Sequence, residues 1–200
     1  MTKAFHPVHQ CNDGVINTSS GKIIDLKNPT TDMIDIHDIA TSLSNICRFG
    51  GHVNRFYSVA QHSVLVYRLM RESGEGYELE ALLHDATETY VGDVVKPLKV
   101  ILGDNYKQLE RNFECIIARK FDLDQAIEIE RLVKQFDMQA LELEHEAFQK
   151  GNYMPLMQTM ERLELNCGHI NWDVREAKRF FMIAFAECVG NREHKRAAAL

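Results

Sequence analysis

The apolar residues of this chain recur at helical spacing from residue 35 onward, and this periodicity restricts the fold more than any other feature. Ile36, Ile39 and Leu43 mark a first helix. Ser58, with Gln61 three residues later, forms a capping box that predicts the start of a second helix. Apolar residues at the same spacing predict helices at about 58–71, 78–89, 105–120, 125–149, 153–163 and from 173. Between 89 and 105 we expect a loop and short helical pieces. We therefore expect a mainly α-helical bundle.

The N-terminal segment follows a different pattern. Val15-Ile16 and Ile23-Ile24 flank the turn residues Ser19-Ser20-Gly21, a sequence typical of a small β-hairpin. A chain of 200 residues can bury one continuous core without a disulfide or metal scaffold. We expect an N-terminal extension with this hairpin over residues 1–34 and one helical domain over 35–196. Residues 197–200 form a short tail that looks vector-derived.

Charge and cysteine content exclude several classes of protein. Lys and Arg number 23 against 29 Asp and Glu, giving a net charge of −6, which disfavours a nucleic-acid polymer or an anionic membrane as partner. The five cysteines are odd in number and form no CxxC pair, as in reduced cytosolic proteins. The longest apolar stretch, 180–186, is far shorter than the roughly 20 residues of a membrane span. We therefore expect a cytoplasmic protein.

Three ionisable residues lie on helix faces that should be buried. His62, Asp85 and Asp137 all have apolar residues three and four positions away along their expected helices. A buried carboxylate without a partner costs several kcal/mol or shifts its pKa until it is neutral. Two buried carboxylates together with buried histidines therefore need a common partner, and a divalent cation is one.

The resulting ligand set is His62, His84, Asp85 and Asp137. Two imidazoles and two carboxylates suit Zn, Mn, Fe or Co and are too rich in nitrogen for a dedicated Mg or Ca site. Neighbouring residues on a helix differ by about 100° around the axis, so His84 and Asp85 reach one ion only if it lies over the edge between them. Each residue taken singly fits a hydrogen-bonded core position, but the four taken together favour a metal site inside a bundle.

At this point the sequence resembles a known family. The runs SVAQHS (58–63), LLHDATE (82–88) and RLVKQFDMQALELE (131–144) are similar to the H…HD…D pattern of HD-domain metal phosphohydrolases. Within that family, residues 42–63 resemble the 5′-deoxynucleotidase group that includes phage dATP triphosphohydrolases, and the likeness extends over about 35–148. The resemblance implies an HD-domain helical bundle in which the four residues above hold a catalytic metal.

Glu88 and Arg48 are the expected catalytic residues. Glu88 follows Asp85 by three residues, one turn further on the same face, where a carboxylate can take a proton from an attacking water. It matches the general acid/base glutamate of the family, and the alternative is a solvated glutamate at a helix end. Arg48 matches an arginine that the family places on the substrate phosphate or sugar, where positive charge stabilises the transition state.

The resemblance also implies substrate contacts. Asp93 matches a family aspartate near the deoxyribose, and Phe49 stands where the deoxynucleotidase has tryptophan. His52, after Gly50-Gly51, is a candidate for a substrate or second-metal contact. Lys96 is a weaker candidate for a phosphate contact, with a surface ion-pair lysine as the equal alternative.

Three functions remain open on the sequence. The first is a dNTP triphosphohydrolase that releases deoxynucleoside and triphosphate, with dATP as first substrate. The second is a 5′-deoxynucleotidase that removes phosphate from dNMPs. The third, from another class, is a non-catalytic helical module that keeps its metal for structure or binds a nucleotide. We expect a Zn, Co, Mn or Fe cofactor, a second divalent ion with the triphosphate, a small-molecule deoxynucleotide partner and a homo-oligomer.

Overall fold

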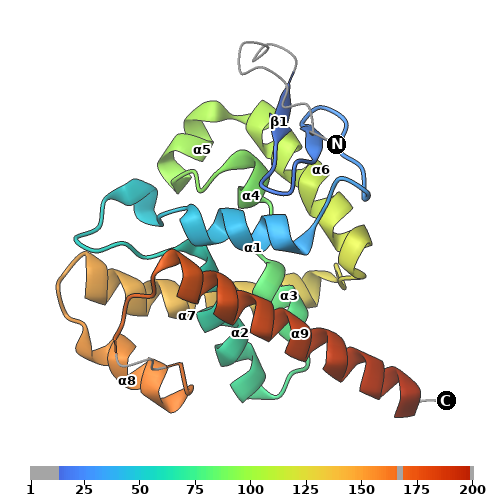
Figure 1. Cartoon of the computed structure of the whole chain (residues 1–200). Coiled ribbons are helices and arrows are strands. Elements are labelled where there is room, and N and C mark those ends of the chain that lie inside the picture. The colour runs from blue at the N-terminus through green and yellow to red at the C-terminus, as the bar shows by residue number, and fades with distance from the viewer. Residues whose placement is uncertain (1–13, 166–168, 199–200) are drawn as a thin grey trace.

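Helices of different length surround one central helix in the computed structural model, which describes residues 14–165 and 169–198 (Figure 1). The expected helical bundle with a small N-terminal hairpin is confirmed. The elements are β1 (Val15–Asn17), β2 (Ile23–Asp25), α1 (Ile36–Asn45), the 3₁₀ turn η1 (Phe49–Gly51), α2 (Val59–Ser73), α3 (Glu78–Leu83), α4 (Glu88–Val91), α5 (Lys96–Leu102), α6 (Asp104–Phe121), α7 (Ile127–Phe148), α8 (Met154–Arg162) and α9 (Val174–Ala198).

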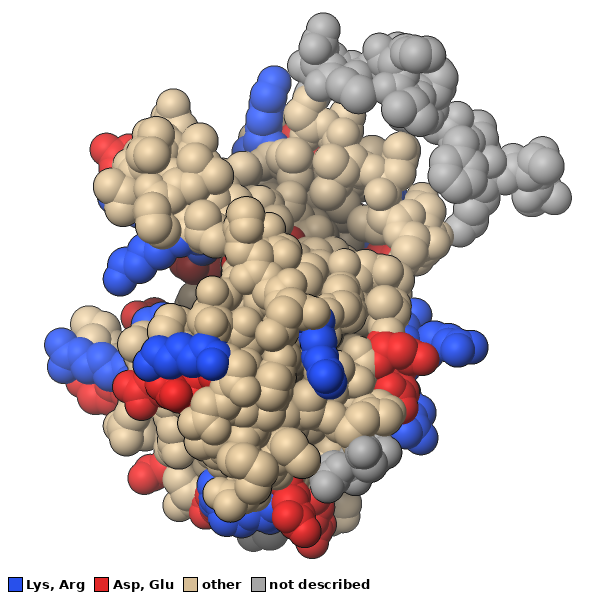
Figure 2. Space-filling model, turned by 90° about the vertical axis from the view of Figure 1, so that its left-hand side faces the viewer, with Lys and Arg blue, Asp and Glu red and all other residues tan. Residues whose placement is uncertain are grey.

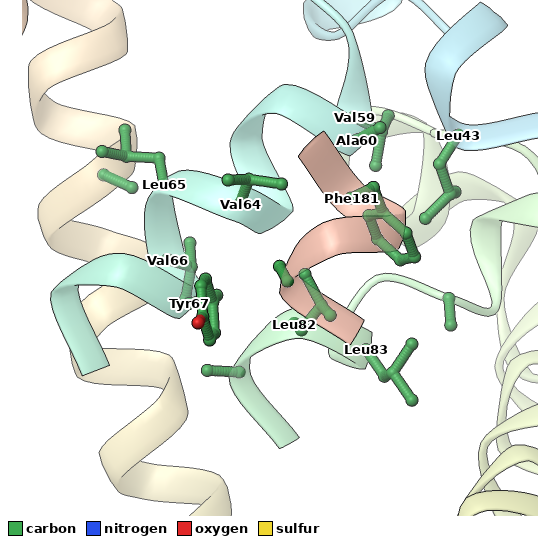
Figure 3. Packing of buried hydrophobic residues seen from close by; sticks show 14 of the residues in the cluster. Leu43, Val59, Ala60, Val64, Leu65, Val66, Tyr67, Leu82, Leu83 and Phe181 are labelled. Carbon is green, nitrogen blue, oxygen red and sulfur yellow. The ribbon is translucent and has the colours of Figure 1, made fainter. Parts of the chain in front are cut away.

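Helix α2 forms the centre of the bundle because it is buried nearly all round. Apolar side chains cover most of its surface, and α1, α3, α7 and α9 pack against it. Figure 3 shows Val59, Val64 and Leu65 of α2 in this core, with Leu82 of α3 and Phe181 of α9 contributing to the same cluster. A polar side chain in the first half of α2, such as His62, is therefore surrounded by other helices, whereas residues 71–73 at its end are exposed.

Both ends of α2 have recognisable caps. The Ser58 hydroxyl accepts a hydrogen bond from the backbone N–H of Gln61 at 3.1 Å, and Gly74 ends the helix with a left-handed φ of 75°. The predicted capping box is only half correct. The Gln61 side chain donates to the carbonyl of Ile170 and accepts from the N–H of Trp172, so it anchors the segment before α9 instead of closing the cap.

The N-terminal hairpin packs into the helical core. β1 and β2 are antiparallel, with Ile16 opposite Ile24, and the Ile24 side chain is fully buried in the main cluster. Asp38 of α1 accepts hydrogen bonds from the Ser19 hydroxyl at 2.8 Å and from the Ser20 hydroxyl at 2.6 Å, which holds the hairpin turn on the bundle. Ile24 and Ile34 of the N-terminal extension thus belong to the core, while Val15 and Ile23 are exposed.

The prediction of one helix over 78–89 is wrong. α3 ends at Leu83, α4 begins at Glu88, and the residues between them form successive turns. The backbone N–H groups of Ala86 and Glu88 bond to carbonyls three residues earlier, at 3.0 Å each. Such bonds tighten the chain to a 3₁₀-like path. His84 and Asp85 therefore lie in a turn, where two adjacent side chains can face one point more easily than on a regular helix.

The surface carries charges of both signs. On the face shown in Figure 2, the described Lys and Arg side chains lie scattered among Asp and Glu around a broad uncharged area. Among the described residues, no helix combines the length and the apolar character that crossing a bilayer requires.

Candidate metal centre

Four side chains from three parts of the chain meet in the bundle. His62 lies on α2, His84 and Asp85 in the turn after α3, and Asp137 on α7. The two ring Nε2 atoms are 3.2 Å apart, and Asp85 Oδ2 lies 3.1 Å from His84 Nε2 and 3.5 Å from His62 Nε2. Asp137 Oδ1 lies 3.2 Å from His62 Nε2 and 3.8 Å from His84 Nε2. His62, His84 and Asp85 form a group able to hold a metal ion, and Asp137 reaches both of its rings.

Hydrogen bonds at the far side of each ring decide which nitrogen faces this point. His84 Nδ1 lies 2.8 Å from the carbonyl of Ala81, which can only accept, so Nδ1 carries a proton. His62 Nδ1 lies 2.7 Å from Glu144 Oε1, a carboxylate oxygen that likewise accepts. In the neutral rings both Nε2 atoms therefore present lone pairs towards two carboxylates. Four acceptors that face one another need a cation between them, and the donor set suits Zn, Mn, Fe or Co.

The titration of these groups reflects the same need for positive charge. Burial by itself would lower the pKa of His84, but the charge of Asp85 and a hydrogen bond to Asp137 outweigh it and raise the pKa to about 10. Burial would raise the pKa of Asp85 and Asp137, yet the nearby rings hold the pKa of both carboxyls well below its usual range. A proton on His84 thus supplies the charge in the metal-free protein, and metal binding displaces it.

Sequence reasoning missed Glu144, the outer partner of His62. This α7 side chain is fully buried and also accepts from Tyr57 and Arg48, while the charge of Arg48 helps to keep its pKa below the usual range against the effect of burial. One signal was available, because Glu144 follows Asp137 by seven residues and so lies two turns further on the same face. A glutamate in a stripe with the buried Ala140 and Ala147 is unexpected unless it has buried partners.

Glu88 lies at the start of α4, beside the candidate metal ligands. It is 6% exposed, and its backbone N–H donates to the carbonyl of Asp85 at 3.0 Å. No hydrogen-bond partner for its Oε2 occurs among the described residues. Burial, followed by the charges of Asp85 and Asp93, raises the pKa of Glu88 to about 9. Glu88 is therefore protonated at neutral pH in the metal-free protein, a state typical of a buried acid/base group.

Arg48 lies inside the site, but its guanidinium already has partners. Its Nε and Nη2 each lie 3.0 Å from Glu144 Oε2, and Nη1 lies 3.5 Å from Asp85 Oδ2. These two carboxylates raise the pKa of Arg48 despite the opposing effect of burial. A substrate contact of this residue thus remains a prediction, whereas its contact with a candidate metal ligand is observed.

The remaining predicted substrate residues lie at different depths. Phe49, in η1, packs against the core with a left-handed φ of 59°, and the Arg48 guanidinium lies 5.5 Å from its ring centre. Asp93 is partly buried, and burial raises its pKa. His52 and Lys96 are exposed, and the backbone carbonyl of His52 accepts from Gln149. Their roles as substrate contacts remain predictions.

A cavity of about 420 Å³ borders the site between α3, α6 and α7. His84, Asp85 and Asp137 contribute to its lining, whereas none of the predicted substrate residues does. Lys134 is the single lysine or arginine of the lining, and its ammonium lies 2.5 Å from Asp137 Oδ2. The acidic residues of the lining are Glu80, Asp85, Glu114, Asp124, Glu130 and Asp137. The cavity is therefore strongly acidic next to the candidate ligands.

Comparisons with known proteins agree with this geometry. The profile of the HD domain matches residues 54–199. The uncharacterized protein YfdR of Escherichia coli (strain K12) is 39% identical over 150 residues, which is 75% of this chain and 82% of that protein. An uncharacterized protein of Rhodobacter capsulatus is 36% identical over 135 residues, which is 64% of this chain and 69% of its relative. Because this profile covers more than half of the chain, the chain belongs to the HD-domain family, whose members are generally metal-dependent phosphohydrolases.

Proposed function

We propose that this protein is a metal-dependent phosphohydrolase of 2′-deoxynucleotides, and that its reaction converts a dNTP, dATP first, into deoxynucleoside and triphosphate. The observation that carries the proposal is the convergence of two imidazole Nε2 atoms and two carboxylates beside the buried Glu88. The choice of a triphosphate rests on the resemblance of residues 42–63 to the phage dATP triphosphohydrolases.

The chemistry divides between the ion and the chain. A divalent ion held by His62, His84, Asp85 and Asp137 would supply Lewis-acid polarisation of a phosphoryl oxygen. Glu88 acts as the general acid/base: it takes the proton of the attacking water and returns it to the 5′-oxygen that leaves as the deoxynucleoside hydroxyl. The water oxygen joins the α-phosphorus while the bond from that phosphorus to the 5′-oxygen breaks, so atoms and protons balance. The buried position of Glu88, which is 6% exposed, limits the access of other water to this carboxylate.

Recognition of the substrate falls to residues on the loops before α2 and after α4. Arg48 contributes positive charge near the reacting phosphate, with Lys96 and His52 as further phosphate contacts. Asp93 accepts a hydrogen bond from a sugar hydroxyl and leaves no room for a 2′-hydroxyl, which favours deoxy over ribo substrates. Phe49 packs against the sugar or base. We propose that these contacts, and not the acidic cavity, bind the anionic end of the substrate.

The acidic cavity makes a second divalent ion part of the proposal. Six carboxylates against one ammonium group line the space next to the candidate ligands. A triphosphate that approaches this lining is repelled unless a cation screens its charge. We therefore propose that the nucleotide binds together with its own divalent ion. The proposal has the protein acting on free nucleotides in the cytoplasm as a homo-oligomer, and sedimentation of the purified protein tests the assembly.

One panel of substrates tests the proposed function. The protein is loaded in turn with Mn, Co, Zn or Mg and incubated with deoxy and ribo mono-, di- and triphosphates, and both products are analysed. We expect triphosphate and deoxyadenosine from dATP, and a loss of at least about 100-fold in kcat for Glu88→Gln. Release of orthophosphate from dAMP, with dATP untouched, replaces the proposal with the 5′-deoxynucleotidase. Absence of hydrolysis under every metal favours the non-catalytic module.

A further inference from the structure

We propose that Glu144 is a positioning residue of the metal centre, which orients His62 directly and Asp85 through Arg48. The inference rests on the proposed metal site and goes beyond it, because Glu144 itself lies outside the ligand set. Its carboxylate is fully buried, it sits seven residues after Asp137 on α7, and no part of the proposed chemistry uses it.

Both oxygens of the Glu144 carboxylate accept hydrogen bonds from side chains in distant parts of the sequence. Oε1 accepts from His62 Nδ1 at 2.7 Å and from the Tyr57 hydroxyl at 3.0 Å. Oε2 accepts from Arg48 Nε at 3.0 Å, and Arg48 Nη2 lies 3.0 Å from the same oxygen as an ion pair. A carboxylate offers about four acceptor sites, and three hydrogen bonds together with the ion pair to Nη2 surround this one. Glu144 is thus held in one orientation by three neighbours and holds each of them in turn.

The contact with His62 determines how that ring can bind an ion. A carboxylate at Nδ1 keeps the proton on that nitrogen and leaves the lone pair of Nε2 free. It also makes the ring a better donor to a metal, and partners of this kind are worth about 10-fold to 100-fold in metal affinity. His84 obtains its tautomer from the neutral carbonyl of Ala81 instead. The two histidines of the site are therefore oriented by different means, and of the two Nδ1 atoms only that of His62 has a charged partner.

The contact with Arg48 protects a second ligand. Arg48 Nη1 lies 3.5 Å from Asp85 Oδ2, close enough for a guanidinium to compete with a metal for that oxygen. Glu144 binds the other two nitrogen atoms of the same guanidinium and so limits its approach to Asp85. With Glu144 in place, Arg48 can orient Asp85 without forming a bidentate ion pair with it.

A purely structural role would not require these charges. Buried ion pairs can often be replaced by apolar residues of similar volume without loss of stability. The choice of a carboxylate at position 144 is explained if its donors need a fixed orientation. The matched case elsewhere in the chain is Glu187 on α9, which also accepts from a tyrosine and an arginine, Tyr67 and Arg71, but contacts no histidine.

The test compares metal affinity among folded variants. Glu144→Gln keeps the volume and removes the charge, Tyr57→Phe removes one donor to the same carboxylate, and Glu187→Gln is the matched control away from the site. Dissociation constants for Zn and Co are measured by chelator competition, and circular dichroism reports the fold. We expect Glu144→Gln to weaken binding about 10-fold to 100-fold, Tyr57→Phe to weaken it by a smaller factor, and the matched control Glu187→Gln to stay within about 3-fold of the wild type.

A second variant keeps the test decisive if Glu144→Gln does not fold. The double variant Arg48→Met/Glu144→Leu removes both buried charges with little change of volume, and we expect it to fold and to lose a similar factor in affinity. Nitrogen NMR of the imidazoles, assigned with His62→Gln, adds a readout specific to one ring. The metal-free wild type at a pH where the rings are neutral should show His62 protonated at Nδ1, and the double variant a mixture of tautomers.

The possible failures can be told apart. If the wild type binds no divalent ion, the proposed function fails and this inference fails with it. If the wild type binds the metal and folded Glu144→Gln, or the double variant, binds it equally well, the positioning role alone is overturned. An unchanged tautomer of His62 in the double variant also overturns it.

Discussion

Two carboxylates of this protein have the same kinds of partner and very different surroundings. Glu144 accepts from Tyr57 and Arg48 in the centre of the bundle, and its side chain is 0% exposed. Glu187 accepts from Tyr67 and Arg71 at the edge of the α2–α9 contact, and its side chain is 35% exposed. The first cluster also includes a histidine of the candidate metal site, while the second ties one helix to another.

The difference teaches that partner types alone do not define the role of a charged group. In the centre, water cannot replace a missing partner, so each donor and acceptor must be matched and any change is transmitted to the others. At the edge, water compensates most of what a substitution removes. The following predictions extend or challenge this comparison, and all refer to protein freed of metal by a chelator.

Removal of the two carboxylates should give the largest contrast. We expect Glu144→Ala to lower the free energy of unfolding by about 3–5 kcal/mol, because it leaves the buried guanidinium of Arg48 with one distant partner. Glu187→Ala should cost less than about 1 kcal/mol. Urea denaturation at pH 7.5 measures both. Similar losses for the two variants would show that the central cluster has no special energetic role.

Glu88→Gln and Glu187→Gln should change the free energy of unfolding in opposite directions, and by less than Glu144→Ala does. The pKa of Glu88 is raised from its ordinary 4.5 to about 9, so the wild type loses stability as the pH rises from about 4.5 to about 9. Glu88→Gln lacks this loss and should be more stable at pH 7.5 by about 1–3 kcal/mol, although catalytically impaired. The pKa of Glu187 is lowered although burial opposes the shift, because Tyr67 and nearby arginines stabilise the ionised form.

The contribution of Glu187 to stability therefore depends on pH in the opposite direction to that of Glu88. Its contribution to stability is present above pH 4.5 and is lost as the pH falls through its lowered pKa. Glu187→Gln should thus be slightly less stable than the wild type at pH 7.5 and equal to it in strong acid. Thermal unfolding at several pH values between about 2 and 9 checks both curves. A Glu88→Gln variant that is less stable at pH 7.5 would contradict the assignment of Glu88 as a buried acid.

The two tyrosines should show the smallest effect. Tyr57→Phe removes a hydrogen bond to a fully buried carboxylate and should cost about 1.5 kcal/mol, while Tyr67→Phe should cost about 0.5 kcal/mol. Raising NaCl to about 1 M should reduce the cost of Tyr67→Phe and leave the cost of Tyr57→Phe nearly unchanged, because salt screens exposed charges far more than buried ones. Equal salt dependence in the two variants would mean that water reaches the central cluster.

Local patterns were sufficient to predict several parts of the molecule. Apolar spacing predicted the helical bundle because periodicity depends only on neighbours along the chain, and the Ser19-Ser20-Gly21 turn predicted the hairpin for the same reason. Polar residues on apolar faces, such as His62 and Asp137, drew attention to the candidate site, since burial of such groups is costly whatever the fold. The sequence by itself thus determined the elements and the residues that need a common partner.

The tertiary structure decided which partner each buried group receives. Glu144 is 82 residues from His62 and 96 from Arg48, so no local pattern could pair them. The turn that places His84 and Asp85 together lies between α3, which packs on α2, α7 and α9, and α4, which packs on α1 and α6, and it replaces the regular helix that propensity favours. Hydrogen bonds and charges in a protein interior depend on distance in space and on the exclusion of water. Both arise only when remote segments pack, which is why they could not be derived from the sequence.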